Sequence, residues 1–375
     1  MSHRFLSLIG ILALAIAVVS LTSIAAQAPT TPAQKAPAVT KAPAAAKAPA
    51  TAKAPATAKA PAAAKASARK WAAPKTPWGD PDLQGVWNDA TSTPLQRPSE
   101  LGGKDTLSDE EAAGFEEQLA FNLTRDRRDG GPEADVNRAY NDHWMDSRRL
   151  KITEDKRTSL IVDPPDGRMP PQVPLSPERQ KARAERAAAN ARFNAGLPDR
   201  VEDMSLPIRC IIRTDSPPYL PTIYNNDFQI FQSPGYVVIV PEMIHSARVI
   251  PLDGRPHLAK GMRQWLGDTR GHFEGNTLVI ETTNFRGDDG VTFQGTNPAT
   301  FTITERFTRV DPGTINYEFT VADPLTWTKP WTAVIPWNRI DPDEQMYEYA
   351  CHEDNYDLVH LMSGARIREK KGETK

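Results

Sequence analysis

Apolar and polar residues alternate with a period of two along much of the chain after Pro207. This period is typical of strands that bury one face and expose the other. We predict eight closely spaced strands, in the sequences DFQIFQ, GYVVIV, MIHSARVI, NTLVIETTNF, ATFTITERFTRV, GTINYEFTVA, WTAVIPW and EQMYEYAC. Turn sequences such as DPG and EGN separate these runs. Their spacing favours a mainly β fold, either an antiparallel lipocalin-like barrel or a sandwich, over a parallel sheet.

Two segments before residue 200 have helical signals and predict helical insertions in the β fold. In LSDEEAAGFEEQLAFNL, Ser108 stands at an N-cap and Glu111 at the capping-box position three residues later. In LSPERQKARAERAAANARFNAG, Ser176 caps a helix so polar that we expect it on the surface. The folded body then comprises a mixed α/β part (76–200), the antiparallel β-barrel (201–366) and a charged tail (367–375).

The first part of the chain has the composition of a targeting signal and a linker. Residues 1–25 place Arg4 before a long apolar run, the layout of a secretory signal peptide. Residues 26–75 are mostly Ala, Pro, Lys and Thr, which predicts a flexible, extended spacer. We therefore expect a periplasmic or secreted protein whose spacer touches peptidoglycan or another envelope polymer. An uncleaved signal would be its only membrane anchor.

Charge is distributed unevenly along the chain. The 45 basic and 47 acidic residues nearly balance, but residues 1–70 contain no acidic residue. The folded body is therefore acidic, which argues against a nucleic-acid partner.

The chain has only two cysteines, Cys210 and Cys351. In an exported protein, an isolated pair of cysteines favours a disulfide over two free thiols. Such a bridge would tie the last predicted strand to the start of the β region. Two cysteines are too few for a zinc site built from four thiolates.

Four side chains are candidates for proton transfer. His245 shares a strand face with apolar neighbours, and histidine suits acid–base chemistry near neutral pH. Glu305 lies within an apolar stripe, where a carboxylate is costly unless it is paired. His352 and Glu348 fall on one face of the last predicted strand and form a second acid–base pair. The structural alternatives are a hydrogen-bonded core histidine and an ion-paired glutamate.

Three arginines are candidates for ligand binding. Arg248, Arg255 and Arg270 would hold a carboxylate or phosphate if their side chains converged. Asp268 would pair with one of them, and a structural ion pair is the alternative for this group. Trp331 lies in the aromatic run TWTKPWTAVIPW, which suits either a core or a stacking wall for a sugar or planar ring.

The sequence contains no recognised metal, nucleotide or hydrolase motif. A metal site made of His245, His257 and His352 is one alternative, because imidazole binds zinc, copper and iron. The sequence identifies no cofactor.

Several passages resemble known proteins. Residues 85–87 (GVW) resemble the Gly-x-Trp start of lipocalin-like barrels, in which the Trp plugs the closed end. The passages VDPPDGRMPP, EMIHSARVIPLDGRPH, WLGDTRGHFEGNTLVIETTNF, ERFTRVDPGTINYEFTVADPLTWTKPWT and YEYACHEDNY resemble a large family of secreted bacterial proteins of unassigned function. This resemblance covers residues 78–365 and implies one continuous module. It implies no reaction.

These features predict an exported β-barrel whose interior binds a small molecule. The ligand would be apolar, aromatic or sugar-containing, and acid–base chemistry would make the protein an isomerase, lyase or hydrolase. The alternatives are a metal-dependent periplasmic enzyme that uses the histidines and a non-catalytic cell-envelope protein.

Overall fold

The structure is a computed structural model. It describes residues 71–124, 131–132, 145–146, 149–213, 215–244, 246–287, 293–341 and 343–373. All of these belong to the second of two units of the chain, Ala68–Lys375. The predicted signal peptide, most of the predicted spacer and His245 lie outside the described residues. Within the described ranges, no helix combines the length and apolar character needed to cross a membrane.

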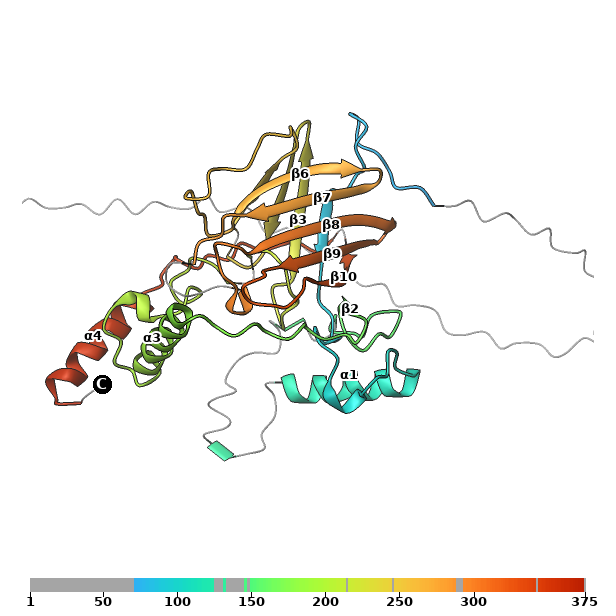
Figure 1. The fold of residues 1–375 in the computed structure, drawn as a ribbon. Helices are drawn as coiled ribbons and strands as arrows, with labels where there is room; N and C mark the ends of the chain where they lie inside the picture. Colours follow the sequence, from blue (N-terminus) through green and yellow to red (C-terminus); the bar gives the residue numbers. More distant parts are fainter. Residues whose placement is uncertain are drawn as a thin grey trace, which may run out of the picture. The chain divides into compact units, whose positions relative to one another are not determined.

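Nine strands of the described chain form a nearly closed antiparallel barrel (Figure 1). Their spatial order is β5 (Arg248–Pro251), β4 (Tyr236–Pro241), β3 (Asp227–Ser233), β1 (Gly85–Asn88), β10 (Trp331–Arg339), β9 (Thr314–Ala322), β8 (Thr302–Asp311), β7 (Thr277–Thr283) and β6 (Asp268–Glu274). A short strand, β2 (Ile161–Asp163), also pairs with β10. Most strands that follow one another in sequence are neighbours in the sheet, and β1 lies between β3 and β10. The topology is therefore up-and-down. The predicted antiparallel β-barrel is confirmed.

The strands β5 and β6 lie side by side at the seam of the barrel, and no ladder joins them in the described sheet. Arg248 Nε on β5 lies 3.2 Å from Thr269 Oγ1 on β6. A Cβ added at Gly271 would lie 2.8 Å from Ile250 Cγ2. Residues 248 and 250 thus face residues 269 and 271 in the same order, so the two strands run parallel. A ring with an odd number of strands requires one such parallel contact, because alternating directions cannot close it.

Two-residue turns connect β3 to β4, β6 to β7 and β8 to β9 at the closed end of the barrel. Trp87 points inside, fully buried, and its Nε1 donates to Leu83 O at 3.0 Å. The guanidinium groups of Arg309 and Arg339 lie 5.4 and 5.7 Å from the centre of the Trp87 ring. Cation–π contacts of this kind hold the indole in place.

Aromatic side chains fill the barrel interior. Phe228 stacks on Trp337 with ring centres 4.3 Å apart, and Tyr317 lies 5.1 Å from Trp337. Phe307 lies 4.7 Å from Tyr317. These four rings are buried, and they occupy the space that a ligand-binding barrel leaves for its ligand. Side chains therefore fill the interior of the described barrel.

Helices α1 (Asp109–Leu123) and α3 (Pro177–Asn194) begin where the sequence predicts. Ser108 and Glu111 form the expected capping box, and Ser176 accepts a hydrogen bond from the backbone of Arg179. A further helix, α4 (Asp357–Lys370), was not predicted. Short 3-10 turns lie at Ser99–Leu101, Val201–Asp203 and Phe293–Gly295.

The predicted last strand, EQMYEYAC, is wrong. Residues 344–350 form no strand, and Tyr347 is 73% exposed. The physical reason is that β10 already pairs with β9 on one edge and with β1 and β2 on the other. No edge of β10 remains for a further strand. The predicted strand MIHSARVI is likewise shorter than expected, since β5 begins only at Arg248.

Candidate functional site

The long connections gather at the open end of the barrel, opposite the two-residue turns. The ends of β4 and β5, of β7 and β8, and of β9 and β10 that long connections join lie there, and β1 leads out of the barrel at the same end. Loops held by a rigid sheet are the usual place for binding residues. Two cavities and a group of carboxyl side chains lie among these loops.

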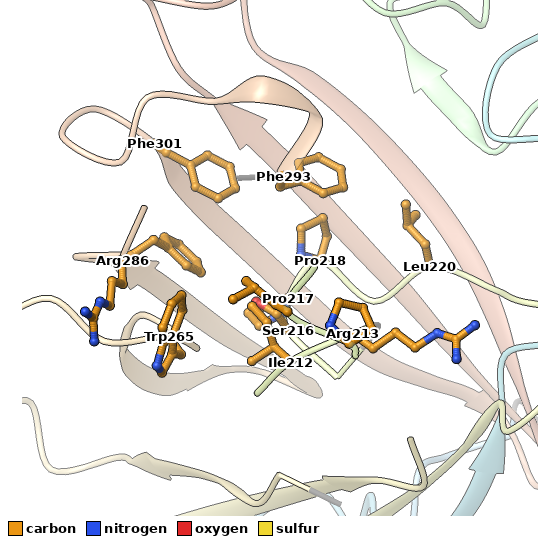
Figure 2. Close-up of a pocket in the computed structure, with 13 residues that line it drawn as sticks. Ile212, Arg213, Ser216, Pro217, Pro218, Leu220, Trp265, Arg286, Phe293 and Phe301 are labelled. Carbon is orange, nitrogen blue, oxygen red and sulfur yellow. The ribbon is translucent and has the colours of Figure 1, made fainter. Parts of the chain in front are cut away.

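An apolar cavity of about 280 Å³, which we call the mouth pocket, lies directly on the barrel core (Figure 2). Phe285 follows the end of β7 and Phe301 precedes β8, with ring centres 4.7 Å apart. Phe293 stacks on Phe301 at 6.1 Å. The remaining wall comes from the segment between α3 and β3, including Leu206, Ile212, Pro217, Pro218 and Leu220, and from Trp265 before β6.

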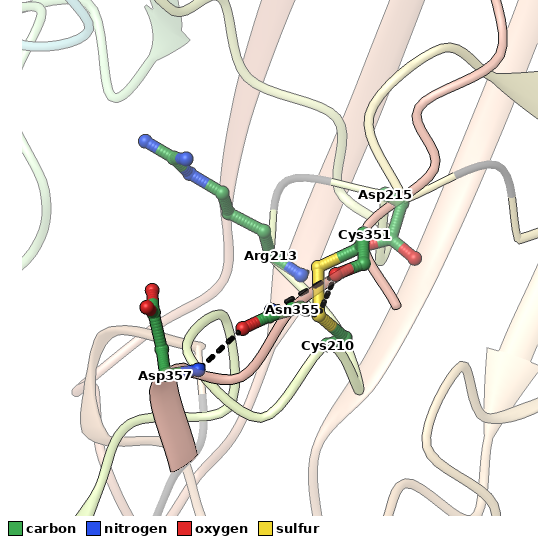
Figure 3. Close-up of a disulfide and its surroundings, with 6 residues drawn as sticks. All are labelled: Cys210, Arg213, Asp215, Cys351, Asn355 and Asp357. Atoms are coloured by element: carbon green, nitrogen blue, oxygen red, sulfur yellow. Dashed lines mark hydrogen bonds between the residues drawn. A yellow bond between two sulfur atoms is a disulfide. The ribbon is translucent and has the colours of Figure 1, made fainter. Parts of the chain in front are cut away.

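The predicted disulfide Cys210–Cys351 is confirmed, with an S–S distance of 2.00 Å and a Cα–Cα distance of 5.8 Å (Figure 3). Cys210 lies between Leu206 and Ile212, two residues that line the mouth pocket. On the other side, Asn355 Nδ2 donates to Cys351 O at 2.9 Å, and its Oδ1 accepts from the backbone of Asp357 at the start of α4. The bridge therefore ties one wall of the mouth pocket to the C-terminal segment.

Arg248 and Glu305, predicted as a ligand-binding residue and a catalytic acid, bind each other inside the barrel. Their side chains are 3% and 0% exposed. Both oxygens of Glu305 accept from the guanidinium, Oε1 at 3.0 Å, and Tyr317 OH donates to Oε1 at 2.9 Å. Arg248 also donates to Thr282 Oγ1 at 2.6 Å. The pair thus has the partners that buried charges require.

Burial and the neighbouring charges fix the protonation states in this network. Burial lowers the pKa of Arg248, but Glu305 and Tyr219 outweigh this effect, so the guanidinium stays charged. Burial raises the pKa of Tyr219 to about 12, and it also raises the pKa of Tyr317. Both phenols therefore remain protonated and able to donate.

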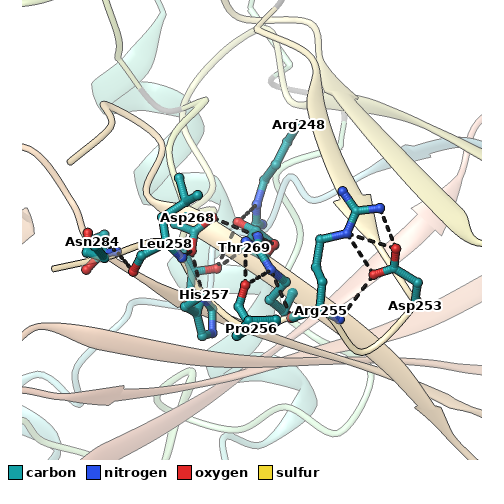
Figure 4. A network of polar contacts seen from close by, with 12 residues as sticks. Arg248, Asp253, Arg255, Pro256, His257, Leu258, Asp268, Thr269 and Asn284 are labelled. Carbon is teal, nitrogen blue, oxygen red and sulfur yellow. Dashed lines mark hydrogen bonds and ion pairs between the residues drawn. The ribbon is translucent and has the colours of Figure 1, made fainter. Parts of the chain in front are cut away.

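His257, Asp268 and Arg270 form a polar network along the seam, of which Figure 4 labels His257 and Asp268. Asp268 Oδ2 lies 2.9 Å from His257 Nδ1, and its Oδ1 accepts from Arg270 Nη1 at 2.7 Å. Burial raises the pKa of Asp268, but hydrogen bonds from the Leu258 amide, His257 and Arg270 bring it below its usual value. Arg270 also donates to Pro256 O at 2.9 Å, which fastens the connection between β5 and β6.

The arginines predicted to bind a ligand do not converge on one point. Arg248 points into the core, Arg270 braces the seam, and Arg255 pairs on the surface with Asp253 and with Tyr236 OH (Figure 4). Each is already engaged by other groups of the protein. Their geometry favours a structural role over joint anion binding.

The other predicted residues lie in different surroundings. Trp331 is buried, with its ring 5.7 Å from Phe319. Glu348 and His352 are exposed on the segment before α4, and because this segment is not a strand, they do not share a strand face. Among the described residues, no group of three or more His, Cys, Asp or Glu side chains is arranged to hold a metal ion.

The sequence did not predict the group of carboxyl side chains that lies at the open end. Asp89 follows β1 and Asp227 begins β3, and Glu242 follows β4, its amide donating to Asp227 O at 2.8 Å. Asp146 approaches them, since Asn226 Nδ2 donates to its Oδ2 at 2.6 Å while the Asp89 amide donates to Asn226 O. Asp146, Asp227 and Glu242 line a cleft of about 1,040 Å³. We call these four acids the carboxyl cluster.

Burial and like charges raise the pKa of three acids of the carboxyl cluster, Asp89, Asp227 and Glu242. Asp89 is 0% exposed, and neither of its carboxyl oxygens has a hydrogen-bond partner among the described residues. Burial, Asp146 and Asp227 raise the pKa of Asp89 well above its usual value. Burial and then Asp227 raise the pKa of Glu242 to about 7. A carboxyl that titrates near neutral pH is suited to general acid–base work.

Replacing Glu305 tests the buried pair. Glu305→Gln leaves the Arg248 charge buried without a counter-ion, so the free energy of unfolding should fall by about 3 to 5 kcal/mol. Denaturant titration measures this loss. The control is Glu318→Gln on the neighbouring strand, where an exposed pair with Arg306 contributes less than about 1 kcal/mol. Equal losses in the two variants would contradict the structural role of Glu305.

Replacing Glu242 tests the carboxyl cluster. Because its pKa is raised in the folded state, Glu242 adds stability that is complete below about pH 4.5 and is lost as the pH rises through about 7. Glu242→Gln should therefore reduce the loss of unfolding free energy between pH 5 and 8 by about 1 to 2 kcal/mol, after solvent screening. Denaturation at several pH values measures this, with Glu110→Gln on α1 as the exposed control. An unchanged pH profile would refute the assignment.

No protein-family model matches the chain, and no curated protein matches it. The functional argument for this chain therefore rests on the geometry of the open end.

Proposed function

We propose that this protein binds a small apolar or aromatic molecule in the mouth pocket. The observation that carries this proposal is the position of the cavity: it opens at the end of a barrel whose interior is already packed. Its volume of about 280 Å³ lies near the lower limit for small-molecule sites, so it suits a compact ligand of two or three rings.

The walls of the mouth pocket offer ring faces to such a ligand. Phe285 and Phe301 are buried and belong to the core, whereas Phe293 and Trp265 are only half-buried. The half-buried rings would lose further contact with water when a ligand binds. Each square ångström of apolar surface so buried contributes about 25 cal/mol, and stacked or edge-on rings add to this.

The likeness to lipocalins is part of the same proposal. An up-and-down barrel with a tryptophan inside its closed end and a ligand at its open end is a lipocalin-like design, here with nine strands instead of eight. We also propose that the protein is exported by residues 1–25 and carries residues 26–75 as an envelope spacer. The disulfide supports export, because such bridges persist in oxidising compartments.

Acid–base chemistry on a molecule bound in the cleft of about 1,040 Å³ is the second function we propose, centred on the carboxyl cluster. Two residues support it: Asp89, whose buried carboxyl oxygens have no hydrogen-bond partner among the described residues, and Glu242, which lines the cleft. Together they would supply a proton donor and a group that accepts protons near neutral pH. Turnover of a bound ligand by the wild-type protein but not by Glu242→Gln would establish this chemistry; equal turnover would exclude Glu242 from it.

Binding of the neutral dye N-phenyl-1-naphthylamine tests the first proposal, since its fluorescence rises in apolar sites. We expect saturable binding by the full chain, weakened about tenfold by Phe293→Ala, which removes a stacking face worth roughly 1.4 kcal/mol. Phe231→Ala is the matched control, because that ring is 45% exposed on β3 and does not line the mouth pocket. Absence of binding, or an equal effect of both substitutions, would refute the proposal.

A further inference from the structure

A polar and basic cleft, which we call the helix cleft, lies between helix α3 and loops at the open end of the barrel. It has a volume of about 700 Å³. One wall is α3, and the opposite wall includes residues 294–298 and Thr326, from the connections that follow β7 and β9. No aromatic ring is among its described lining residues, so the helix cleft differs in kind from the mouth pocket.

Three arginines of the helix cleft follow one stripe of α3. Arg179, Arg183 and Arg186 stand at positions i, i+4 and i+7, and Asn190 continues the stripe at i+11. Side chains at these spacings lie on one face of a helix. With a rise of 1.5 Å per residue, the first and the third arginine are about 10 Å apart along the helix axis. The stripe can therefore offer positive charge to more than one acidic group.

Arg179 fastens α3 to the loops through neutral acceptors. Its Nη2 donates to Gly295 O at 2.8 Å and to Thr326 Oγ1 at 2.9 Å, and its Nη1 donates to Leu325 O. The carboxylate of Asp323 meets Arg179 only through the Thr326 hydroxyl, which donates to Asp323 Oδ2 at 2.5 Å. These contacts hold the arginine in place and leave its charge without a carboxylate in direct contact.

Arg183 and Arg186 likewise have no carboxylate partner among the described residues. Arg186 donates to the backbone carbonyl of Glu202 at 2.8 Å, a neutral acceptor. Arg183 is exposed, and its guanidinium makes no hydrogen bond or ion pair in the described chain. Glu178 is the one acid of the described lining, and hydrogen bonds from its own amide and from Ser176 lower its pKa. One negative charge therefore stands against three positive charges in the helix cleft.

Polar groups without partners complete the walls of the helix cleft. Thr296 is 3% exposed, and its Oγ1 has no hydrogen-bond partner among the described residues. Buried hydroxyls are normally paired, so this one is a group that a ligand can satisfy. The side-chain amides of Asn190 and Gln294 also line the cleft and make no hydrogen bond in the described chain. Amides and hydroxyls can both donate and accept, which suits the hydroxyl groups of a sugar.

We propose that the helix cleft binds acidic oligosaccharides, with carboxylate or sulfate groups on the arginine stripe and sugar hydroxyls on the polar groups of the walls. Guanidinium groups match the paired oxygens of these anions. The volume of about 700 Å³ lies within the range of small-molecule sites. The helix cleft shares no described lining residue with the mouth pocket, so this inference does not depend on the function proposed for that pocket.

Trigalacturonate and its fully methyl-esterified form test the proposal, because they share one skeleton and differ in charge. We expect the wild-type full chain to bind trigalacturonate about tenfold more tightly than the ester at low salt, and this advantage should shrink as salt screens the arginines. Isothermal titration calorimetry measures both affinities. Equal affinities would overturn the proposal. Inorganic sulfate that binds as tightly as trigalacturonate would overturn the assignment to a saccharide.

Replacing Arg183 locates the site. Because this side chain is exposed and has no partner in the described chain, Arg183→Gln should fold normally and bind trigalacturonate about tenfold more weakly. Lys181→Gln is the matched control. It removes the same charge from the same helix, but Lys181 pairs with Glu185 at 3.9 Å and is not among the described lining residues of the helix cleft. Thermal unfolding checks that both variants are folded.

The lysines of residues 26–75 are the competing site for an anion on this chain. Binding to those lysines would be the same in the wild-type protein and in Arg183→Gln. An affinity for trigalacturonate that Arg183→Gln leaves unchanged, or that the two variants reduce equally, would therefore overturn the proposal. A loss confined to Arg183→Gln would place the anionic groups in the helix cleft.

Discussion

The barrel depends on the buried pair of Arg248 and Glu305. At the seam, β5 and β6 run parallel, and no backbone ladder joins them in the described sheet. Arg248 projects from β5 across this gap and reaches Thr269 on β6, Thr282 on β7 and Glu305 on β8. Arg248 therefore makes side-chain connections across the seam, where backbone hydrogen bonds join neighbouring strands elsewhere in the ring. The cost of burying its charge is offset only because every donor finds an acceptor.

A barrel closed in this way has little space for a ligand. The ion pair and its tyrosines fill the middle of the interior, and aromatic rings fill the part towards the closed end. What remains open is the ring of long loops at the other end, where the mouth pocket and the carboxyl cluster lie. The packed scaffold thus occupies the interior and the closed end of the barrel, and the candidate sites lie at the open end. The disulfide holds one wall of the mouth pocket to the C-terminal segment.

The sequence predicts those features that local patterns determine. Alternation in residues 302–339 predicts three strands and places Glu305 on the apolar face, and capping residues predict the starts of α1 and α3. It does not predict features that depend on distant partners. Glu305 and Arg248 are each conspicuous, but 57 positions separate them, and only the fold shows that they pair. The carboxyl cluster likewise assembles from four separate segments, and the predicted last strand fails because both edges of β10 are already paired.

The barrel has nine strands, an odd number, and this number explains the long connection between β5 and β6. In a ring with an even number of strands, a short hairpin turn would connect β5 to β6. With nine strands, β5 ends at one end of the barrel and β6 begins at the other. Residues 252–267 connect these two ends. Near the end of this connection, Trp265 lines the mouth pocket. The odd number of strands therefore requires a long return connection, and this connection brings an aromatic ring to the open end of the barrel.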